Sequence, residues 1–222
     1  MDRLKVSTLF IYNLGFKSGD NREVFVKSIN AYKLLLCLID NYFNSIDNSD
    51  KLPKTTLLNR YKFKKESLRY LKNYQRPLEH IRLDYKDNSK KIFYGIFIRK
   101  DYILYYVNKK IHEIVTKYNY NIEIPVLVLN SFKSFYSFRF YLLTKVIFKN
   151  RAVIKYKLST LRKLLTLDNS VFLNNRNFCR FIIEKSINEI NQTDLLSHKI
   201  NYKYERNKYR KVEYIILYKS KK

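Results

Sequence analysis

Apolar residues recur every three or four positions in four stretches of the chain, which is the spacing of one helix face. The first half contains such a stretch at residues 24–43 and a second that ends near His80. The second half contains one that begins near Ser131 and another from Arg176 to about Gln192. Each half also has a short apolar run between its two long helical stretches, which in the second half lies at residues 157–165. These runs predict one additional short helix per half.

Alternating apolar and polar residues follow the last helix of each of these sets and predict a β-hairpin. In the first half the strands are expected at residues 81–85 and 92–98, around a polar turn at residues 87–89. In the second half they are expected at residues 199–205 and 211–218. Helices followed by a hairpin are the order of a winged-helix domain.

The repeated order predicts an α+β fold of two tandem winged-helix domains. We expect the first domain at residues 21–121 and the second at residues 122–222, with residues 1–20 as an N-terminal arm or strand. Both lengths are ordinary for an independent domain. The first domain is expected to end with an apolar segment at residues 102–107 and a helix through Lys117.

The chain of 222 residues is strongly basic, with 45 Lys and Arg against 19 Asp and Glu and a formal charge of +26. Such a field attracts polyanions, of which nucleic acid is the most common. Lys, Asn, Ile and Tyr also have AT-rich codons, so base composition of the gene alone would raise the charge. The positions of the cations are therefore more informative than their total.

The expected helix from Arg176 offers side chains that suit base edges in the major groove, which is about 12 Å wide. An Asn at position 174 or 175 is expected to cap its first turn. Arg pairs with guanine, Asn with adenine, and an apolar ring packs on the thymine methyl group. We therefore expect base contacts from Arg176, Asn177, Arg180 and Phe181. The alternatives are a solvated helix face for the arginines and packing of Phe181 under the wing or the preceding loop.

Two further groups of cations suit phosphate, which fixes register and affinity without reading sequence. The first group lies in and beside the turn of the second hairpin and consists of Lys203, Arg206, Lys208, Arg210 and Lys211. The second group lies on the second helix of the first half and consists of Lys64, Lys65, Arg69, Lys72 and Arg76. A solvated surface is the alternative for both groups.

The residue types needed for catalysis are poorly represented. The chain has three glycines, and none is followed by the Lys-Ser or Lys-Thr pair of a phosphate-binding loop. Its three histidines, His80, His112 and His198, are too far apart in sequence for a two-histidine metal motif. A tyrosine-based nicking enzyme would need such a cluster. We expect no enzymatic activity, no cofactor and no metal.

Cys37 and Cys179 fall in apolar helical patterns and are expected to be buried free thiols. The chain shows neither a signal-peptide pattern at its start nor an uncharged apolar run of about 18 residues. We therefore expect a soluble cytoplasmic protein without a membrane partner.

The run Phe178-x-Arg180-x-Ile182-Ile183, with Ser186–Asn191 and the basic hairpin after it, resembles the C-terminal winged helix of bacterial plasmid replication initiators that bind iterons. Residues 133–143 resemble the helix that opens the second domain of that family, and residues 158–167 resemble its short second helix. The resemblance extends from about Ser131 to Leu217. Before Ser131 the chain resembles the family only in the order of its helices and strands.

This resemblance implies a non-catalytic initiator with two winged helices that both meet double-stranded origin DNA. It also implies opening of an AT-rich segment, recruitment of host helicase and initiator proteins, and a homodimer that represses through the first domain. Family members often carry basic residues where Cys179 and Phe181 stand here. A winged-helix transcriptional or plasmid-maintenance regulator that binds operator DNA is the main alternative, and a nicking replication enzyme is a third.

Overall fold

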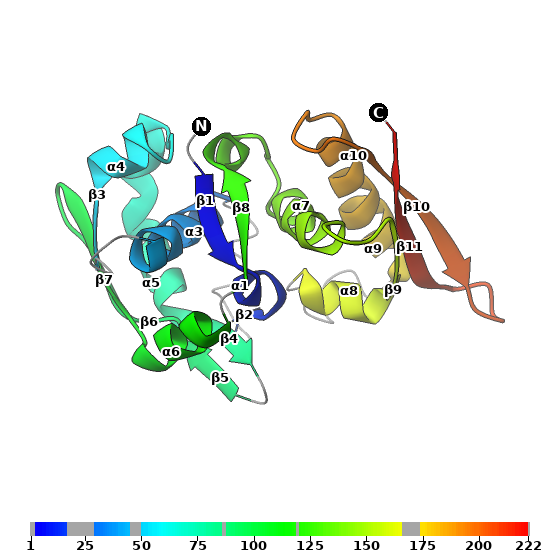
Figure 1. The fold of residues 1–222 in the computed structure, drawn as a ribbon, viewed down its shortest axis with the longest axis horizontal. Coiled ribbons are helices and arrows are strands. Elements are labelled where there is room, and N and C mark those ends of the chain that lie inside the picture. Colours follow the sequence, from blue (N-terminus) through cyan, green and yellow to red (C-terminus); the bar gives the residue numbers. More distant parts are fainter. Residues whose placement is uncertain are drawn as a thin grey trace. The chain divides into compact units, whose positions relative to one another are not determined.

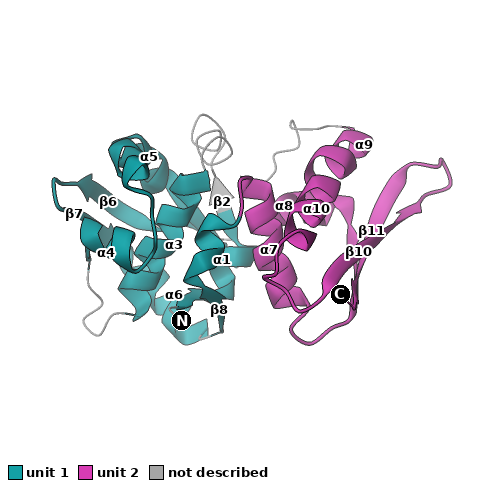
Figure 2. Ribbon diagram, turned by 90° about the horizontal axis from the view of Figure 1, so that it is seen from above, with its two compact units in different colours: residues 1–131 teal, residues 132–222 magenta. Residues whose placement is uncertain are grey.

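The computed structural model describes residues 3–16, 29–44, 50–85, 88–118, 120–165 and 174–221. The chain divides into two compact units, Met1–Ser131 and Phe132–Lys222 (Figure 2). Both combine helices with small antiparallel sheets, so the fold is α+β. Residues 24–28 of the first expected helix, residue 87 of the first expected turn and residues 166–167 lie outside the described residues.

The core of unit 1 is the helix α3 (Ile29–Asn44), which is buried along most of its length (Figure 1). Its Asp40 is only 1% exposed and joins three segments. The carboxylate accepts hydrogen bonds from the Lys5 backbone amide at 2.8 Å, the Arg60 guanidinium at 2.8 Å and the Tyr61 hydroxyl at 2.7 Å. These bonds satisfy a buried charge that would otherwise be costly.

The N-terminal strand β1 (Arg3–Ser7) pairs antiparallel with β8 (Asn121–Pro125). The short helix α1 (Thr8–Tyr12), capped by the Ser7 hydroxyl, lies between β1 and β2 (Leu14–Phe16). Residues 122–131, which the sequence analysis grouped with the second half, therefore belong to unit 1. They include the 3₁₀ helix η2 (Val126–Asn130). The pairing of β1 with β8 is non-local, and the hydrophobic pattern contains no sign of it.

Unit 1 continues in the winged-helix order. Of the two three-stranded sheets among its described residues, the one that contains the wing has the strand order β3-β7-β6, and the other has the order β2-β4-β5. The elements are β3 (Lys51–Pro53), α4 (Lys54–Asn59), the 3₁₀ helix η1 (Lys65–Tyr70), α5 (Leu71–His80), β6 (Phe93–Ile98) and β7 (Tyr102–Val107), followed by α6 (Lys109–Tyr118). The wing of this unit is the β6–β7 hairpin.

The expected pairing of residues 81–85 with residues 92–98 is wrong. The strand β4 (Ile81–Tyr85) pairs with β5 (Asn88–Lys91) and with β2, whereas β6 pairs with β7. Both hairpins close shorter loops than the expected pairing, which costs less chain entropy. The strand β5 was missed because Asn88–Lys91 has no apolar residue.

Unit 2 repeats this layout with the strand order β10-β11-β9, which corresponds to β6-β7-β3 of unit 1 (Figure 1). Its elements are α7 (Phe135–Ile147), β9 (Val153–Lys157), α8 (Leu158–Leu164), α9 (Asn175–Phe178), the π-helix η3 (Cys179–Glu184), α10 (Lys185–Asn191), β10 (Lys199–Arg206) and β11 (Val212–Ser220). Each unit thus folds as a winged helix, as the sequence predicts.

The segments α9, η3 and α10 form one continuous helix, called the recognition helix below. Phe178, Ile182, Ile183, Ser186 and Ile190 are buried on its inner side, as their spacing predicts. Cys37 and Cys179 are buried free thiols, which confirms that expectation. Among the described helices none has the length and apolar character needed to cross a membrane.

Candidate nucleic-acid interface

The recognition helix begins with two asparagines that act differently. The Asn174 side chain accepts a hydrogen bond from the Arg176 backbone amide at 2.8 Å, which is the predicted cap. Asn175 instead connects the helix to its surroundings. Its Nδ2 donates to the Val212 carbonyl of the wing at 2.9 Å, and its Oδ1 accepts from Arg162 of α8 at 3.3 Å.

The middle of the recognition helix is a π turn at Cys179–Glu184. The buried residues 178, 182, 186 and 190 follow at a strict spacing of four, as do residues 179, 183 and 187. In an α-helix this spacing drifts by about 40° per turn away from one face. A π turn uses more residues per turn and brings the row back toward the core. As a result, the opposite side of the helix keeps Arg176, Asn177, Arg180 and Phe181 exposed.

The tip of the wing is organised by Asn207. The Asn207 amide donates to the Lys211 carbonyl at 2.9 Å, and its side-chain Oδ1 accepts from the backbone amides of Tyr209 and Lys211 at 3.0 and 3.1 Å. Arg210 adopts a left-handed backbone with φ of 59°, which the tight turn requires. The turn leaves all five expected phosphate contacts exposed, namely Lys203, Arg206, Lys208, Arg210 and Lys211.

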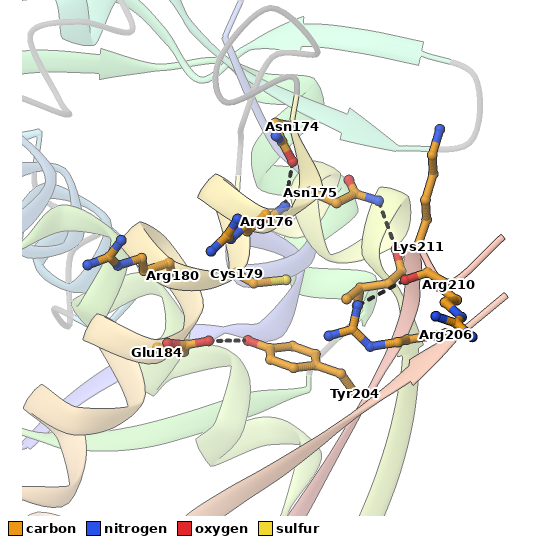
Figure 3. A pocket seen from close by; sticks show the side chains of 11 residues that line it. Asn174, Asn175, Arg176, Cys179, Arg180, Glu184, Tyr204, Arg206, Arg210 and Lys211 are labelled. Atoms are coloured by element: carbon orange, nitrogen blue, oxygen red, sulfur yellow. Dashed lines mark hydrogen bonds between the residues drawn. The ribbon is translucent and has the colours of Figure 1, made fainter.

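A cleft of about 830 Å³ lies between the recognition helix and the wing (Figure 3). Five cations line it, two from the helix and three from the wing: Arg176, Arg180, Arg206, Arg210 and Lys211. Glu184 is the one acidic residue among the lining residues. The structure thus brings part of the expected base-reading set and part of the expected phosphate set to one concave surface.

Four of the nine contacts expected in unit 2 do not line the cleft. Asn177 is exposed on the helix, and Lys203 and Lys208 are exposed on the wing. Phe181 is 38% exposed, and its ring centroid is 5.5 Å from the Arg180 guanidinium carbon and 5.3 Å from the Lys185 ammonium nitrogen. The ring therefore combines an apolar face with adjacent positive charge.

Sequence reasoning missed the residues at the base of the cleft. The Tyr204 hydroxyl donates to Glu184 Oε1 at 3.2 Å, and the Cys179 side chain is also hydrogen-bonded with Tyr204. Burial raises the pKa of Tyr204 far above its usual value, so the phenol remains protonated. The sequence signal was a single acid, Glu184, on the same outer face of the helix as Arg180.

Residues 157–218 match the family described as "Initiator Rep protein, WH2". This segment resembles an initiator Rep winged-helix domain and is called the Rep domain below. The match begins at the last residue of β9 and includes every residue that lines the cleft. The cationic cleft is therefore a feature of the Rep domain itself.

Two solved structures share the fold beyond the Rep domain. One, described as "Crystal structure of Pi initiator protein in complex with iteron DNA", covers 99% of this chain and 97% of its own, with 14% identity and a TM-score of 0.68. The other comprises domains 2 and 3 of RctB and covers 85% of this chain and 81% of its own, with 13% identity and a TM-score of 0.53. No curated protein sequence matches the chain significantly.

The corresponding surface of unit 1 is different in character from the Rep domain. The structure exposes the five cations that the sequence analysis selected there, on or just before η1 and on α5: Lys64, Lys65, Arg69, Lys72 and Arg76. Its wing exposes the aromatic side chains Tyr94, Phe97 and Tyr106 on its strands and the cations Arg99 and Lys100 at its turn. The described residues contain no group of three or more His, Cys, Asp or Glu that could bind a metal ion.

Proposed function

We propose that this protein is a plasmid replication initiator that binds repeated origin DNA, or iterons, mainly through its Rep domain. The observation that carries the proposal is the five-cation cleft between a capped helix and a basic wing, within the residues that match the initiator Rep family. The Pi initiator, whose fold covers 99% of this chain, was crystallised with iteron DNA. A cleft of this charge suits a polyanion.

The helix and the wing are proposed to divide the contacts with DNA. Arg176, Asn177, Arg180 and Phe181 are exposed on the helix and have the chemistry to read base edges. Lys203, Arg206, Lys208, Arg210 and Lys211 of the wing contact phosphates and contribute affinity that depends on salt. Arg176 and Arg180 line the same cleft as three wing cations. A backbone strand in the cleft would therefore lie beside the bases that the helix reads.

The first unit is proposed to add contacts through Lys64, Lys65, Arg69, Lys72 and Arg76. By resemblance to the plasmid initiators, the bound protein opens an AT-rich segment and recruits the host helicase and initiator proteins. The same resemblance assigns a homodimer to the first unit. The wing of unit 1 has fewer exposed cations in its turn than the wing of the Rep domain and exposes three aromatic side chains on its strands, which supports different contacts for the two units.

A two-part experiment separates an initiator from an operator-binding regulator. An initiator should bind tandem direct repeats, about two helical turns apart, beside an AT-rich segment near its own gene. A plasmid with this region should then depend on the gene for its replication. Binding to a single inverted repeat, together with unchanged replication after deletion of the gene, would favour the regulator.

The charge of the cleft is tested with two variants of equal net charge. Arg210→Ala removes a cation from the cleft, whereas Lys199→Ala removes one at the opposite end of the same hairpin. We expect Arg210→Ala to weaken repeat binding and plasmid maintenance, and Lys199→Ala to behave as wild type. Equal effects of the two variants would indicate that only the total charge matters.

A further inference from the structure

Hydrogen bonds connect the recognition helix and the wing at two places along the cleft (Figure 3). Near the helix start, Asn175 Nδ2 donates to the Val212 carbonyl at 2.9 Å. Further along the helix, the Tyr204 hydroxyl donates to Glu184 Oε1 at 3.2 Å. Figure 3 shows the Tyr204 ring reaching from the wing strand to the helix. Along the cleft the helix and the wing are therefore joined at two places, in addition to the two bonds between Asn191 of the helix and Ile200 of β10 at the other end of the hairpin.

The end of the wing needs such support because it extends beyond the third strand of its sheet. The strand β9 pairs only with residues 214–218 of β11, so residues 206–213 belong to a two-stranded ribbon. A two-stranded hairpin alone is marginally stable in water. In addition, the cations on the two walls of the cleft repel each other and favour its opening.

The Tyr204–Glu184 pair has the chemistry of a durable connection. Because burial raises the pKa of Tyr204, its hydroxyl remains a donor throughout the physiological pH range. A carboxylate facing a phosphate-binding cleft is otherwise unfavourable, since it repels the ligand. The hydrogen bond that Glu184 accepts from Tyr204 explains the presence of an acid on this cationic surface.

We propose that Tyr204, Glu184 and Asn175 are positioning residues that set the opening of the cleft. They would act through the wing cations, by placing Arg206, Arg210 and Lys211 on the phosphates of one DNA strand. This inference rests on the proposed binding of DNA in the cleft. It adds which residues hold the cleft at the right width before DNA binds. Preorganisation increases affinity by lowering the cost of ordering the interface.

The main test is Tyr204→Phe, which keeps the ring and removes only the hydroxyl. We expect a loss of about three- to tenfold in affinity for repeat DNA, because the hydrogen bonds of the hydroxyl with Glu184 and Cys179 are lost. The slope of log K against log salt should become shallower by about 1 to 2, because the wing contacts fewer phosphates. Tyr218→Phe, an exposed tyrosine on β11, is the matched control and should bind as wild type.

One further variant, Glu184→Gln, distinguishes positioning from a reduction of the positive charge of the cleft. Glu184→Gln keeps an acceptor for Tyr204 and should lose less affinity than Tyr204→Phe. If Glu184 only lowered the positive charge of the cleft, Glu184→Gln would instead strengthen binding to every duplex and Tyr204→Phe would have no effect. That pair of results would overturn the proposal.

The route through the wing cations is tested by adding Tyr204→Phe to a triple Arg206→Ala, Arg210→Ala, Lys211→Ala variant. We expect no further loss in this background, and an undiminished loss would overturn the positioning role. Failure of the proposed function would look different. In that case the wild-type protein would not prefer repeat DNA to random duplex, or the triple variant would bind as wild type. Circular dichroism of each variant verifies that it is folded.

Discussion

Arg180 and the wing cations line or flank the same cleft, yet their chemistry predicts different effects on DNA binding. Arg180→Ala should cost about 1 to 3 kcal/mol, mainly on the cognate repeat, because a base contact is lost. Lys208→Ala should weaken binding to all duplexes similarly and reduce the salt slope by about 1. Titrations of cognate and random duplex at several salt concentrations measure both effects. Equal losses on the two duplexes for Arg180→Ala would remove this residue from the base-reading set.

Phe181 is predicted to recognise the C5-methyl group of thymine. Replacing thymine by uracil in the repeat removes only this methyl group and should cost the wild-type protein about 1 kcal/mol for each methyl contact. Phe181→Ala should bind the thymine and uracil repeats equally. Competition binding with the two repeats measures the difference. If Phe181→Ala still preferred thymine, another residue would contact the methyl group.

Lys33 gives unit 1 a dependence on pH that is separate from DNA binding. The side chain is 6% exposed, and burial is the main cause that lowers its pKa to about 8. Below that pH the folded chain carries a buried charge, whereas unfolded Lys keeps its proton up to about pH 10.4. The contribution of Lys33 to stability therefore rises between these two values.

Lys33→Met should consequently stabilise the protein at pH 7, by at most about 3 kcal/mol. This gain should shrink as the pH rises from 8 to 10. Urea unfolding of both proteins at pH 7 and 9.5 measures the change, with the exposed Lys117→Met as the control. A gain that was the same at both pH values would contradict the assignment to Lys33 ionisation.

Individual hydrogen bonds were harder to predict from the sequence than the exposure or burial of side chains. The asparagine cap and the buried row of the recognition helix follow from residue type and spacing. The Tyr204–Glu184 bond joins residues 20 positions apart through the fold, so neither sequence segment indicates it. The bond from Asn175 to Val212 was also not predictable. An asparagine at the start of a helix can either cap the helix or donate a hydrogen bond to another segment.

At the scale of elements, the recognition helix depends on its first turn. Asn174→Ala should destabilise unit 2 by about 1 kcal/mol, because the Arg176 amide loses its acceptor. Asn174→Ser should retain the cap and most of the stability. Chemical denaturation monitored by a probe in unit 2 measures the difference. Equal stability of the two variants would show that the cap contributes little here.

Most helices were predicted correctly because their apolar residues repeat at helical spacing. The π turn at Cys179–Glu184 has its own signal, the strict spacing of four over residues 178–190, which an angular plot with a constant 100° step conceals. The first hairpin was paired incorrectly because β5 has no apolar residue. The β1–β8 pair depends on a contact between residues more than 100 positions apart.

At the scale of the whole molecule, two units share an element order but differ in the surfaces of their wings. The Rep domain has a cleft lined by five cations, whereas the first unit exposes Tyr94, Phe97 and Tyr106 on its wing strands beside Arg99 and Lys100 at the turn. The order of helices and wing was accessible from the repeated pattern, whereas the strand pairing of the first unit was not. The difference between the wings depends on which residues of β6 and β7 face outward, and that required the correct pairing of these strands.

The central claim, that the chain recognises repeated origin DNA, is tested most directly by its preference for that DNA. The measurement compares the affinity for the tandem direct repeats beside its own gene with that for a shuffled duplex of equal length and composition, near physiological salt. We predict a preference of at least about 10³-fold, as specific DNA-binding proteins show. Equal affinity for the two duplexes would contradict the account and reduce the +26 charge to non-specific attraction.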